Sequence, residues 1–298
     1  MAVTAAPFTP PCCPNPGCGF HRPGTAGWRC KRAGFYPRQC HPRRIQRYRC
    51  LHCGRYFSTQ TFAVSYWLRH PEWLTPLLHR SLGCSAGRQI AREFGCAPTT
   101  VTRQLARLGR HCLLFHELHR PHGPLTEPLV VDGFESFEFS HYHPVYFNLA
   151  AGALSHYFYA FTDAELRRKG RMTATQRRRR AVLEARRGRP HPGAVELETA
   201  ELLRLVAPAP QCLELHTDDH PAYPRALRRL PHLRVHHRVT SARAPRTPRN
   251  PLFPVNLLDL LIRHCGANHK RETIAFSKRR QAQAGTVVGT QTRKGVVR

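Results

Sequence analysis

Three aspartates are the residues whose chemistry is most informative, because carboxylates are rare in this chain. Its 298 residues contain 47 Lys and Arg against 18 Asp and Glu, a formal net charge of +29 at pH 7. Asp132 and Asp218 each end an apolar run, and Asp259 lies within a third, helix-like run. Divalent cations such as Mg²⁺ take oxygen ligands, and basic surroundings hold a polyanion. A single strand-end aspartate is more often a turn former or helix cap, but the three together favour metal-dependent chemistry on a phosphodiester.

The third carboxylate is a choice between two residues, since Asp259 and Glu272 are the only acids after Asp219. Asp259 sits among leucines of the predicted helix, where a buried carboxylate needs a partner or a metal. Arg263, one turn further on, could be that partner. Glu272 lies in a charged stretch and could be an exposed ion-pair partner. We favour Asp259, with Glu272 as the alternative third carboxylate. Asp219 is likewise a backup for Asp218, but Asp218 directly continues the strand and Asp219 has the place of a turn residue.

The histidines offer a further metal site, at His141 and His143 or at His216 and His220. Ordinary surface or core histidines are the better interpretation of these positions. His216 nevertheless precedes Asp218 by two residues on the same strand face, so it could approach the carboxylates.

Four cysteines in two short-spaced pairs predict a tetrahedral Zn²⁺ site in which each pair supplies one knuckle. They are Cys13, Cys18, Cys50 and Cys53. Residues 1–71 contain 11 Lys and Arg and no Asp or Glu, so zinc there must be held by Cys or His. The segment is small and has few large apolar residues, so it needs a bound metal for stability. Three further cysteines rank lower as ligands: Cys12, Cys30 and Cys40.

Residues 85–110 have the pattern of a helix-turn-helix. Ser85 is expected to cap a first helix, residues 95–97 break it, and Pro98 opens a second helix that extends to Leu108. Any two adjacent helices of a small bundle could give this pattern, but the turn chemistry and the preceding basic segment favour DNA binding. The side chains that the second helix would present to phosphates and base edges are Thr99, Thr100, Thr102, Arg103, Gln104 and Arg107.

The remaining chain alternates strand and helix patterns after a predicted linker at residues 111–126. Consecutive short strands favour an antiparallel meander, and the later alternation favours an α/β or α+β fold. The strands are expected at 129–139, 145–154, 156–161, 213–217 and 233–239, and the helices at 194–206 and 255–263. The Arg-rich run at 167–189 is either a solvated helix face or a disordered insertion; in both cases it would touch DNA weakly and without sequence preference.

The composition limits the class of partner. No apolar run approaches the ~20 residues of a membrane span, and the first residues do not form a signal peptide. We therefore expect a cytoplasmic protein with no membrane partner, whose 12 cysteines are free thiols or metal ligands. The strongly basic charge indicates nucleic acid as the partner.

The order of these segments resembles that of bacterial insertion-sequence transposases of the DDE type. The resemblance covers roughly residues 12–280. The motifs that carry it are Arg47-Tyr-Arg-Cys-Leu-His-Cys-Gly-Arg-Tyr-Phe-Ser58, Val130-Val-Asp-Gly-Phe134, Thr217-Asp-Asp-His-Pro-Ala-Tyr223, and Asn256 to Arg263 followed by Arg271-Glu-Thr-Ile-Ala-Phe-Ser-Lys278. Members of this type often carry Glu two turns before an Arg, where this chain has Asn256; Asp259 lies one turn later on the same helix face.

The resemblance implies an RNase H-like (retroviral-integrase-like) catalytic domain preceded by a zinc ribbon and a helix-turn-helix. The implied segments are a zinc ribbon at 12–58, a helix-turn-helix DNA-binding domain at 66–115, a DDE catalytic domain at 127–280 and a disordered tail at 284–298. The implied activity is Mg²⁺- or Mn²⁺-dependent cleavage and transfer of DNA strands, with Asp132, Asp218 and Asp259 as the metal carboxylates.

The implied partners are double-stranded DNA, both as terminal inverted repeats and as target, and at least a second copy of the chain to bring two ends together. The implied location is the bacterial cytoplasm, in association with the nucleoid. Two alternatives stay open. One is a catalytically degenerate relative that only binds DNA, and the other is a metal-dependent nuclease that cleaves without strand transfer.

Overall fold

The computed structural model describes residues 8–121, 123–270 and 275, and the chain divides into two compact units. The first unit is Met1–Leu77 and the second is Leu78–Arg298. Glu272 and the tail at 284–298 lie outside the described residues. Among the described residues, no helix is both long enough and apolar enough to cross a membrane.

The first unit is a small antiparallel sheet with a core of cysteines and aromatic rings. Its strands β1 (Cys30–Pro37), β2 (Arg44–Cys50) and β3 (Tyr56–Ser58) pair in the order β1-β2-β3, and the 3₁₀ helices η1 (Thr59–Phe62) and η2 (Pro71–Trp73) follow. Tyr48 and Phe57 stack with ring centroids 5.6 Å apart, beside three buried cysteines. A core this small gives little burial energy by itself, so a metal held by the cysteines would be a main source of stability.

The second unit begins with three helices: α1 (Leu74–Leu82), which crosses the unit boundary, α2 (Gly87–Glu93) and α3 (Pro98–His119). The predicted turn between α2 and α3 is present, with Gly95 at φ +59°, a backbone conformation that glycine adopts without strain. Ser85 is not the cap as predicted: Ala86 occupies the N-cap, and its N–H donates to Gln89 Oε1 at 2.8 Å.

The predicted linker at 111–126 is wrong over its first part, because α3 continues as a helix to His119. Cys112 and Leu113 pack against the buried cluster of the following sheet, and His116 Nε2 lies 2.9 Å from the carbonyl oxygen of Tyr159. These long-range contacts stabilise helix where the local sequence reads as linker. Because α3 has 22 residues, it is about 33 Å long and joins the helix-turn-helix rigidly to the sheet.

A five-stranded mixed sheet forms the centre of the second unit, with strand order β6-β5-β4-β7-β8. Its strands are β4 (Leu129–Phe137), β5 (Pro144–Gly152), β6 (Phe158–Glu165), β7 (Gln211–Thr217) and β8 (Leu233–Val239). β4, β5 and β6 form the predicted antiparallel meander, whereas β7 is parallel to β4 and β8 is parallel to β7. The protein is thus of the α/β class, as the sequence indicated.

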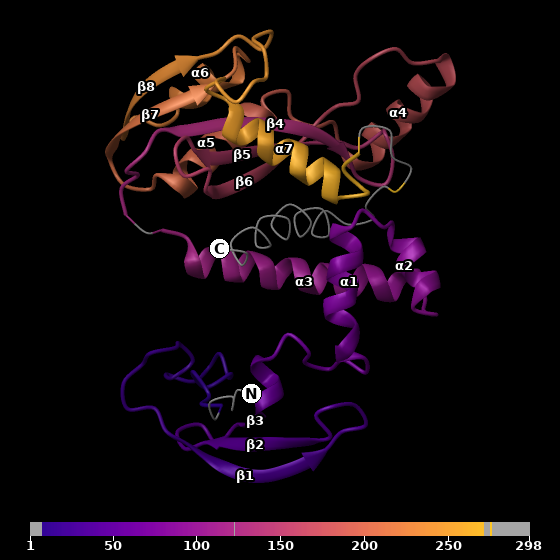
Figure 1. The fold of residues 1–298 in the computed structure, drawn as a ribbon, viewed down its shortest axis with the longest axis vertical. Coiled ribbons are helices and arrows are strands. Elements are labelled where there is room, and N and C mark those ends of the chain that lie inside the picture. The colour runs from indigo at the N-terminus through magenta and orange to yellow at the C-terminus, as the bar shows by residue number, and fades with distance from the viewer. Residues whose placement is uncertain (1–7, 122, 271–274, 276–298) are drawn as a thin grey trace. The chain divides into compact units, whose positions relative to one another are not determined.

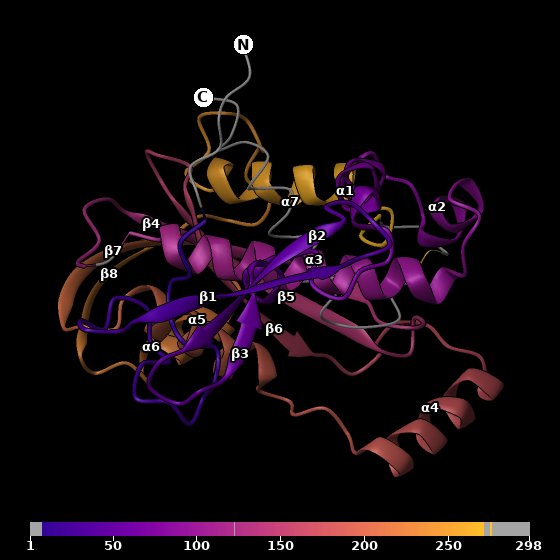
Figure 2. The ribbon, with the colours of Figure 1, turned by 90° about the horizontal axis from the view of Figure 1, so that it is seen from below.

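Helices cover both faces of this sheet (Figures 1 and 2). They are α5 (Ala194–Val206), α6 (Ala222–Leu227) and α7 (Phe253–Cys265), whereas α4 (Ala174–Arg187) projects away from the sheet (Figure 2). Alternation along β4 sorts its side chains between the faces: Leu129 and Val131 pack with α5 and α6, and Val130 and Phe134 pack with α7. The predicted helices at 194–206 and 255–263 and strands at 213–217 and 233–239 are confirmed. The Arg-rich run forms α4, so it is a helix.

Candidate carboxylate site and cysteine cluster

Asp132 and Asp218 lie at matching positions beside the pairing of two neighbouring parallel strands. The pairing of β4 with β7 ends at Val130 opposite His216, and each aspartate follows two residues later, Asp132 within β4 and Asp218 directly after β7. Beyond this point β4 pairs with β5 alone, so the two strands diverge at their carboxyl ends. Divergence of this kind in an α/β sheet opens a crevice where ligands bind.

Asp132 is largely buried, and its surroundings disfavour the ionised form. Burial and the negative charges of Asp218 and Asp259 raise the pKa of Asp132 to about 6, although the backbone N–H of Gly133 and the charge of Arg246 act in the opposite direction. The Gly133 N–H donates to Asp132 Oδ1 at 2.7 Å. All three predicted carboxylates therefore lie close enough to interact electrostatically.

Two tyrosines that the sequence analysis missed, the buried Tyr223 and the half-buried Tyr146, lie close enough to interact with Asp132. The Tyr223 hydroxyl donates to Asp132 Oδ1 at 3.5 Å, and it also interacts with the Tyr146 side chain. Burial, followed by the charges of nearby groups including Asp132, raises the pKa of both phenols, so both hydroxyls stay protonated. The only sequence signal was the position of Tyr223 at the end of the Thr217–Tyr223 motif. Gly133 is required here, because a Cβ would collide with the carbonyl oxygen of Phe147 and the Tyr146 ring.

Asp259 lies on α7 and forms the predicted pair with Arg263. Arg263 Nε donates to Asp259 Oδ1 at 2.7 Å, and both side chains are about one-fifth exposed. The Arg263 guanidinium also reaches the carbonyl oxygens of Glu135 on β4 and of His269, at 3.5 and 3.2 Å, and lies 5.0 Å from the Phe134 ring centroid. Arg263 thus ties α7 to β4 independently of the carboxylate.

Asp218 begins the turn after β7, and its Oδ1 accepts a hydrogen bond from the His220 N–H at 3.0 Å. Asp219 is exposed, as expected of a turn residue. His216 Nε2 lies 3.2 Å from Glu214 Oε1, and its buried Nδ1 has no hydrogen-bond partner among the described residues. His216 therefore contacts Glu214, which is not one of the candidate carboxylates.

The three aspartates are neighbours but do not form a closed metal site. Within the described chain, the oxygen atoms of Asp132, Asp218 and Asp259 do not all lie within 4.8 Å of one another. The carboxylates are chemically suitable ligands for Mg²⁺ or Mn²⁺. All three carboxylates can hold one ion only if Asp259 separates from Arg263. Otherwise Asp132 and Asp218 would bind the ion without Asp259.

The four predicted cysteines do meet. The Sγ atoms of Cys13, Cys18, Cys50 and Cys53 all lie within 4.8 Å of one another, which no other group of potential ligands does among the described residues. Burial opposes ionisation of Cys50, but N–H groups, including the Trp28 Nε1 that donates to its Sγ at 3.3 Å, outweigh it and lower the pKa to about 6. Hydrogen bonds also lower the pKa of Cys53. A cluster of four thiols with two acidic members could bind Zn²⁺, which takes thiolate ligands.

The other candidate cysteines are separate from this group. Cys40 Sγ donates to the carbonyl oxygen of Leu68 at 3.4 Å. Cys12 is buried and Cys30 half-buried, and burial raises the pKa of both thiols. None of these three thiols belongs to the group whose Sγ atoms meet among the described residues, so the geometry agrees with the ranking from sequence spacing.

The predicted DNA-contacting side chains lie along the first three turns of α3, and only some are open. Thr99 and Arg103 are exposed and one turn apart on the same helix face. Thr102 Oγ1 donates to the carbonyl oxygen of Pro98 at 3.0 Å. Thr100, Thr102, Gln104 and Arg107 are partly covered. Thr99 and Arg103 are therefore the most accessible pair for a groove or phosphate contact.

Comparisons with known proteins give a distant structural similarity only. No protein-family model matches the chain, and no curated protein matches it either. Among solved structures, one match is a chain in the cryo-EM structure of the simian T-cell lymphotropic virus intasome in complex with PP2A regulatory subunit B56 gamma. The identity is 15%, the TM-score is 0.25, and the match covers 72% of this chain and 64% of that chain, just under two thirds of its length. A similarity this distant assigns neither family nor activity.

Proposed function

We propose that this protein is a DNA transposase of the DDE type, with an RNase H-like catalytic domain. The observation that best supports the proposal is the parallel pairing of β4 with β7, which brings Asp132 and Asp218 to the same edge of the sheet. Asp259 is near enough for its charge to raise the pKa of Asp132. Clustered carboxylates with a perturbed pKa in a strongly basic protein are typical of sites that bind a cation and a phosphodiester.

The metal is part of this proposal. Asp132, Asp218 and Asp259 would hold Mg²⁺ or Mn²⁺, which when bound activates a hydroxyl nucleophile and stabilises the leaving oxygen. Arg263 neutralises Asp259 in the absence of a cation, and the carbonyl contacts of Arg263 keep it in place when Asp259 turns to the metal. Tyr223 and Gly133 orient Asp132 by donating to its Oδ1.

The amino-terminal segments would bind the ends of the element. Zn²⁺ held by the four clustered cysteines would fix the basic first unit, and α3 would place Thr99 and Arg103 on duplex DNA. Cleavage and joining at two ends require at least two copies of the chain. The proposed partners are therefore terminal inverted repeats, target DNA and a second copy of the protein.

The test is cleavage of a duplex that carries the inverted repeats flanking the gene, with Mg²⁺, with Mn²⁺ and with EDTA. Asp132→Asn should abolish nicking at the repeat end, and Asp219→Asn is the matched control, since it removes an exposed neighbouring carboxylate. Asp259→Asn and Glu272→Gln are compared in parallel, and the inactive variant identifies the third carboxylate. The proposal fails if Asp132→Asn cleaves as well as the parent.

The two alternatives give different results in the same assay. A degenerate relative is favoured by the Asp259–Arg263 pair and by the absence of a closed carboxylate site among the described residues. It would bind the repeats equally with metal or EDTA and never nick them. A nuclease would nick the repeat end but would not join the free 3′ end to a second duplex.

A further inference from the structure

Helix α4 is an unusual element of the second unit, because it is strongly cationic and has no apolar face. It follows β6 and precedes α5 in the chain, and it projects away from the sheet (Figures 1 and 2). None of its 14 residues, all of which the structure describes, is buried. Residues 167–189 contain 11 Lys and Arg and a single acid, Glu184. Most helices in proteins are stabilised by burying a face, and like charges one turn apart destabilise a helix.

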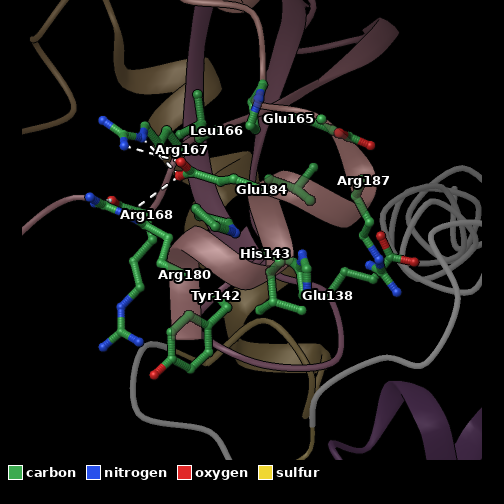
Figure 3. Close-up of a pocket in the computed structure, with 15 residues that line it drawn as sticks. Glu138, Tyr142, His143, Glu165, Leu166, Arg167, Arg168, Arg180, Glu184 and Arg187 are labelled. Atoms are coloured by element: carbon green, nitrogen blue, oxygen red, sulfur yellow. Dashed lines mark hydrogen bonds and ion pairs between the residues drawn. The ribbon is translucent and has the colours of Figure 1, made fainter. Parts of the chain in front are cut away.

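Polar interactions at its base hold α4 in place. Arg167 donates to both carboxylate oxygens of Glu184, at 2.8 and 3.1 Å, and Arg180 Nε lies 3.4 Å from the same carboxylate (Figure 3). The hydrogen bonds from Arg167 lower the pKa of Glu184. Thr173 and Gln176 form a capping box at the amino end of the helix. The helix is thus anchored by its one acid and presents its remaining charge outward.

The arginines on the inner side of α4 are engaged with the body of the unit. Arg180 and Arg187 of α4, with Arg168 from the segment before the helix, border a pocket of about 380 Å³ between α4 and the ends of β5 and β6. Arg168 and Arg179 lie over the Tyr142 ring, with guanidinium carbons 4.3 and 5.2 Å from its centroid. Arg187 lies 5.9 Å from the centroid of Phe139. These contacts fix the orientation of the helix.

The outer side of α4 carries arginines with no such contacts. The side chains of Arg177, Arg178 and Arg186 are exposed and make no hydrogen bond, ion pair or ring contact within the described chain. Arg178 and Arg186 are two turns apart, with the exposed Val182 between them on the same face, and Arg177 lies on the flank of that face opposite to Arg186. Because α4 is about 21 Å long, these side chains can reach several phosphates of a DNA duplex.

We propose that the outer face of α4 is a sequence-independent docking surface for the backbone of duplex DNA, used to hold target DNA. This inference rests on the proposed function for the identity of the target. Guanidinium groups pair with phosphate oxygens in a bidentate manner. The face has no aromatic side chain, so it lacks the stacking platforms that bind single strands and the aromatic anchors usual in protein–protein interfaces.

The experiment measures binding of the full-length protein to a fluorescent duplex without inverted repeats, at salt concentrations from 50 to 200 mM. The test variant is Arg177→Gln, Arg178→Gln and Arg186→Gln together. The matched control is Arg225→Gln, Arg228→Gln and Arg234→Gln, which removes the same charge from exposed positions near α6 and β8. A third variant with Lys at the three α4 positions keeps the charge and reports any loss of folding.

Removal of three phosphate contacts should reduce the slope of log affinity against log salt by about 2.7. The parent should therefore lose about 40-fold more affinity than the α4 variant between 50 and 200 mM salt. The Lys variant should keep a slope close to that of the parent, and the control should change it less than the α4 variant. Equal effects of the α4 variant and the control would overturn the inference, as would tighter binding of a single-stranded probe or an acidic peptide through the same arginines.

Failure of this inference and failure of the proposed function are distinguishable. If α4 holds target DNA, the α4 variant nicks repeat ends like the parent but joins them poorly to an unrelated duplex. If the α4 variant loses duplex affinity while Asp132→Asn leaves cleavage intact, the docking surface stands and the catalytic proposal falls. If the α4 variant has the same slope of log affinity against log salt as the parent and joins DNA ends equally well, α4 does not hold target DNA. The catalytic proposal is unaffected by that result.

Discussion

The substitution Asp132→Asn should stabilise the sheet unit in the absence of metal. The pKa of Asp132 is raised to about 6, above a value near 3.9 for an unfolded aspartate. A carboxyl group whose pKa is raised on folding destabilises the folded state when it is ionised. This penalty is absent below the unfolded pKa and is complete once the pH has risen above the folded pKa. At pH 8 the ionised Asp132 therefore destabilises the fold by about 3 kcal/mol, because each pKa unit corresponds to about 1.4 kcal/mol.

Asparagine keeps the shape and the acceptor for the Gly133 N–H but carries no charge. The variant should be more stable than the parent by about 3 kcal/mol at pH 8, and by roughly half as much at pH 5. Added Mg²⁺ should narrow the gap at pH 8, because a cation bound to the carboxylates stabilises the parent alone. Asp219→Asn is the control: this exposed carboxylate should give no comparable change.

Amide hydrogen exchange of β4 and β5 is the appropriate assay, since all three tryptophans, Trp28, Trp67 and Trp73, belong to the first unit. Tryptophan fluorescence would therefore follow the wrong part of the chain. A gain of about 3 kcal/mol slows exchange through global opening of the sheet roughly 150-fold. The reasoning is refuted if Asp132→Asn exchanges as fast as the parent at pH 8, or if the gain is as large at pH 5 as at pH 8.

Three further changes have definite expected outcomes. Chelation of zinc, or Cys50→Ser, should unfold the first unit and change the fluorescence of Trp28, which donates to Cys50 Sγ; unchanged fluorescence and urea midpoint would show that the cysteines hold no structural metal. Gly133→Ala should destabilise the sheet by about 2 kcal/mol or more, since the new methyl group meets the carbonyl oxygen of Phe147; parent-like exchange in β4 would contradict this. Glu184→Gln should increase amide exchange in α4 without affecting β4, and equal protection in variant and parent would show that the Arg167–Glu184 contact does not anchor the helix.

Much of the fold follows from local sequence patterns. The helix at 194–206 and the strand at 233–239 have the predicted bounds, because their apolar residues repeat with helical or alternating spacing. Spacing also selected the four cysteines that meet, since two close pairs supply a tetrahedral set. In contrast, residues 111–119 are helical through contacts made far along the chain, with the sheet that follows. No local pattern carries that information.

The candidate site shows the same division between local and long-range information. Asp132 and Asp218 were identifiable, because each ends an apolar run in a chain with few acids, although β4 continues past Asp132 to Phe137. Tyr146 and Tyr223 were not, since their importance comes from the packing of β5 and α6 against β4. The pairing of Asp259 with Arg263 could be predicted from a spacing of four residues along a helix. The additional contact of Arg263 with Glu135 could not.

The Asp259–Arg263 pair is no strong obstacle to metal binding. Exposed ion pairs four residues apart on a helix typically contribute about 0.3–0.5 kcal/mol, whereas ionised Asp132 costs about 3 kcal/mol at pH 8. Arg263 keeps its carbonyl contacts with β4 after the carboxylate leaves. In the function that we propose, a cation bound by the aspartates would offset the part of the Asp132 penalty that comes from the charges of Asp218 and Asp259, which is smaller than the part that comes from burial. Such a cation would compete with Arg263 for the Asp259 carboxylate.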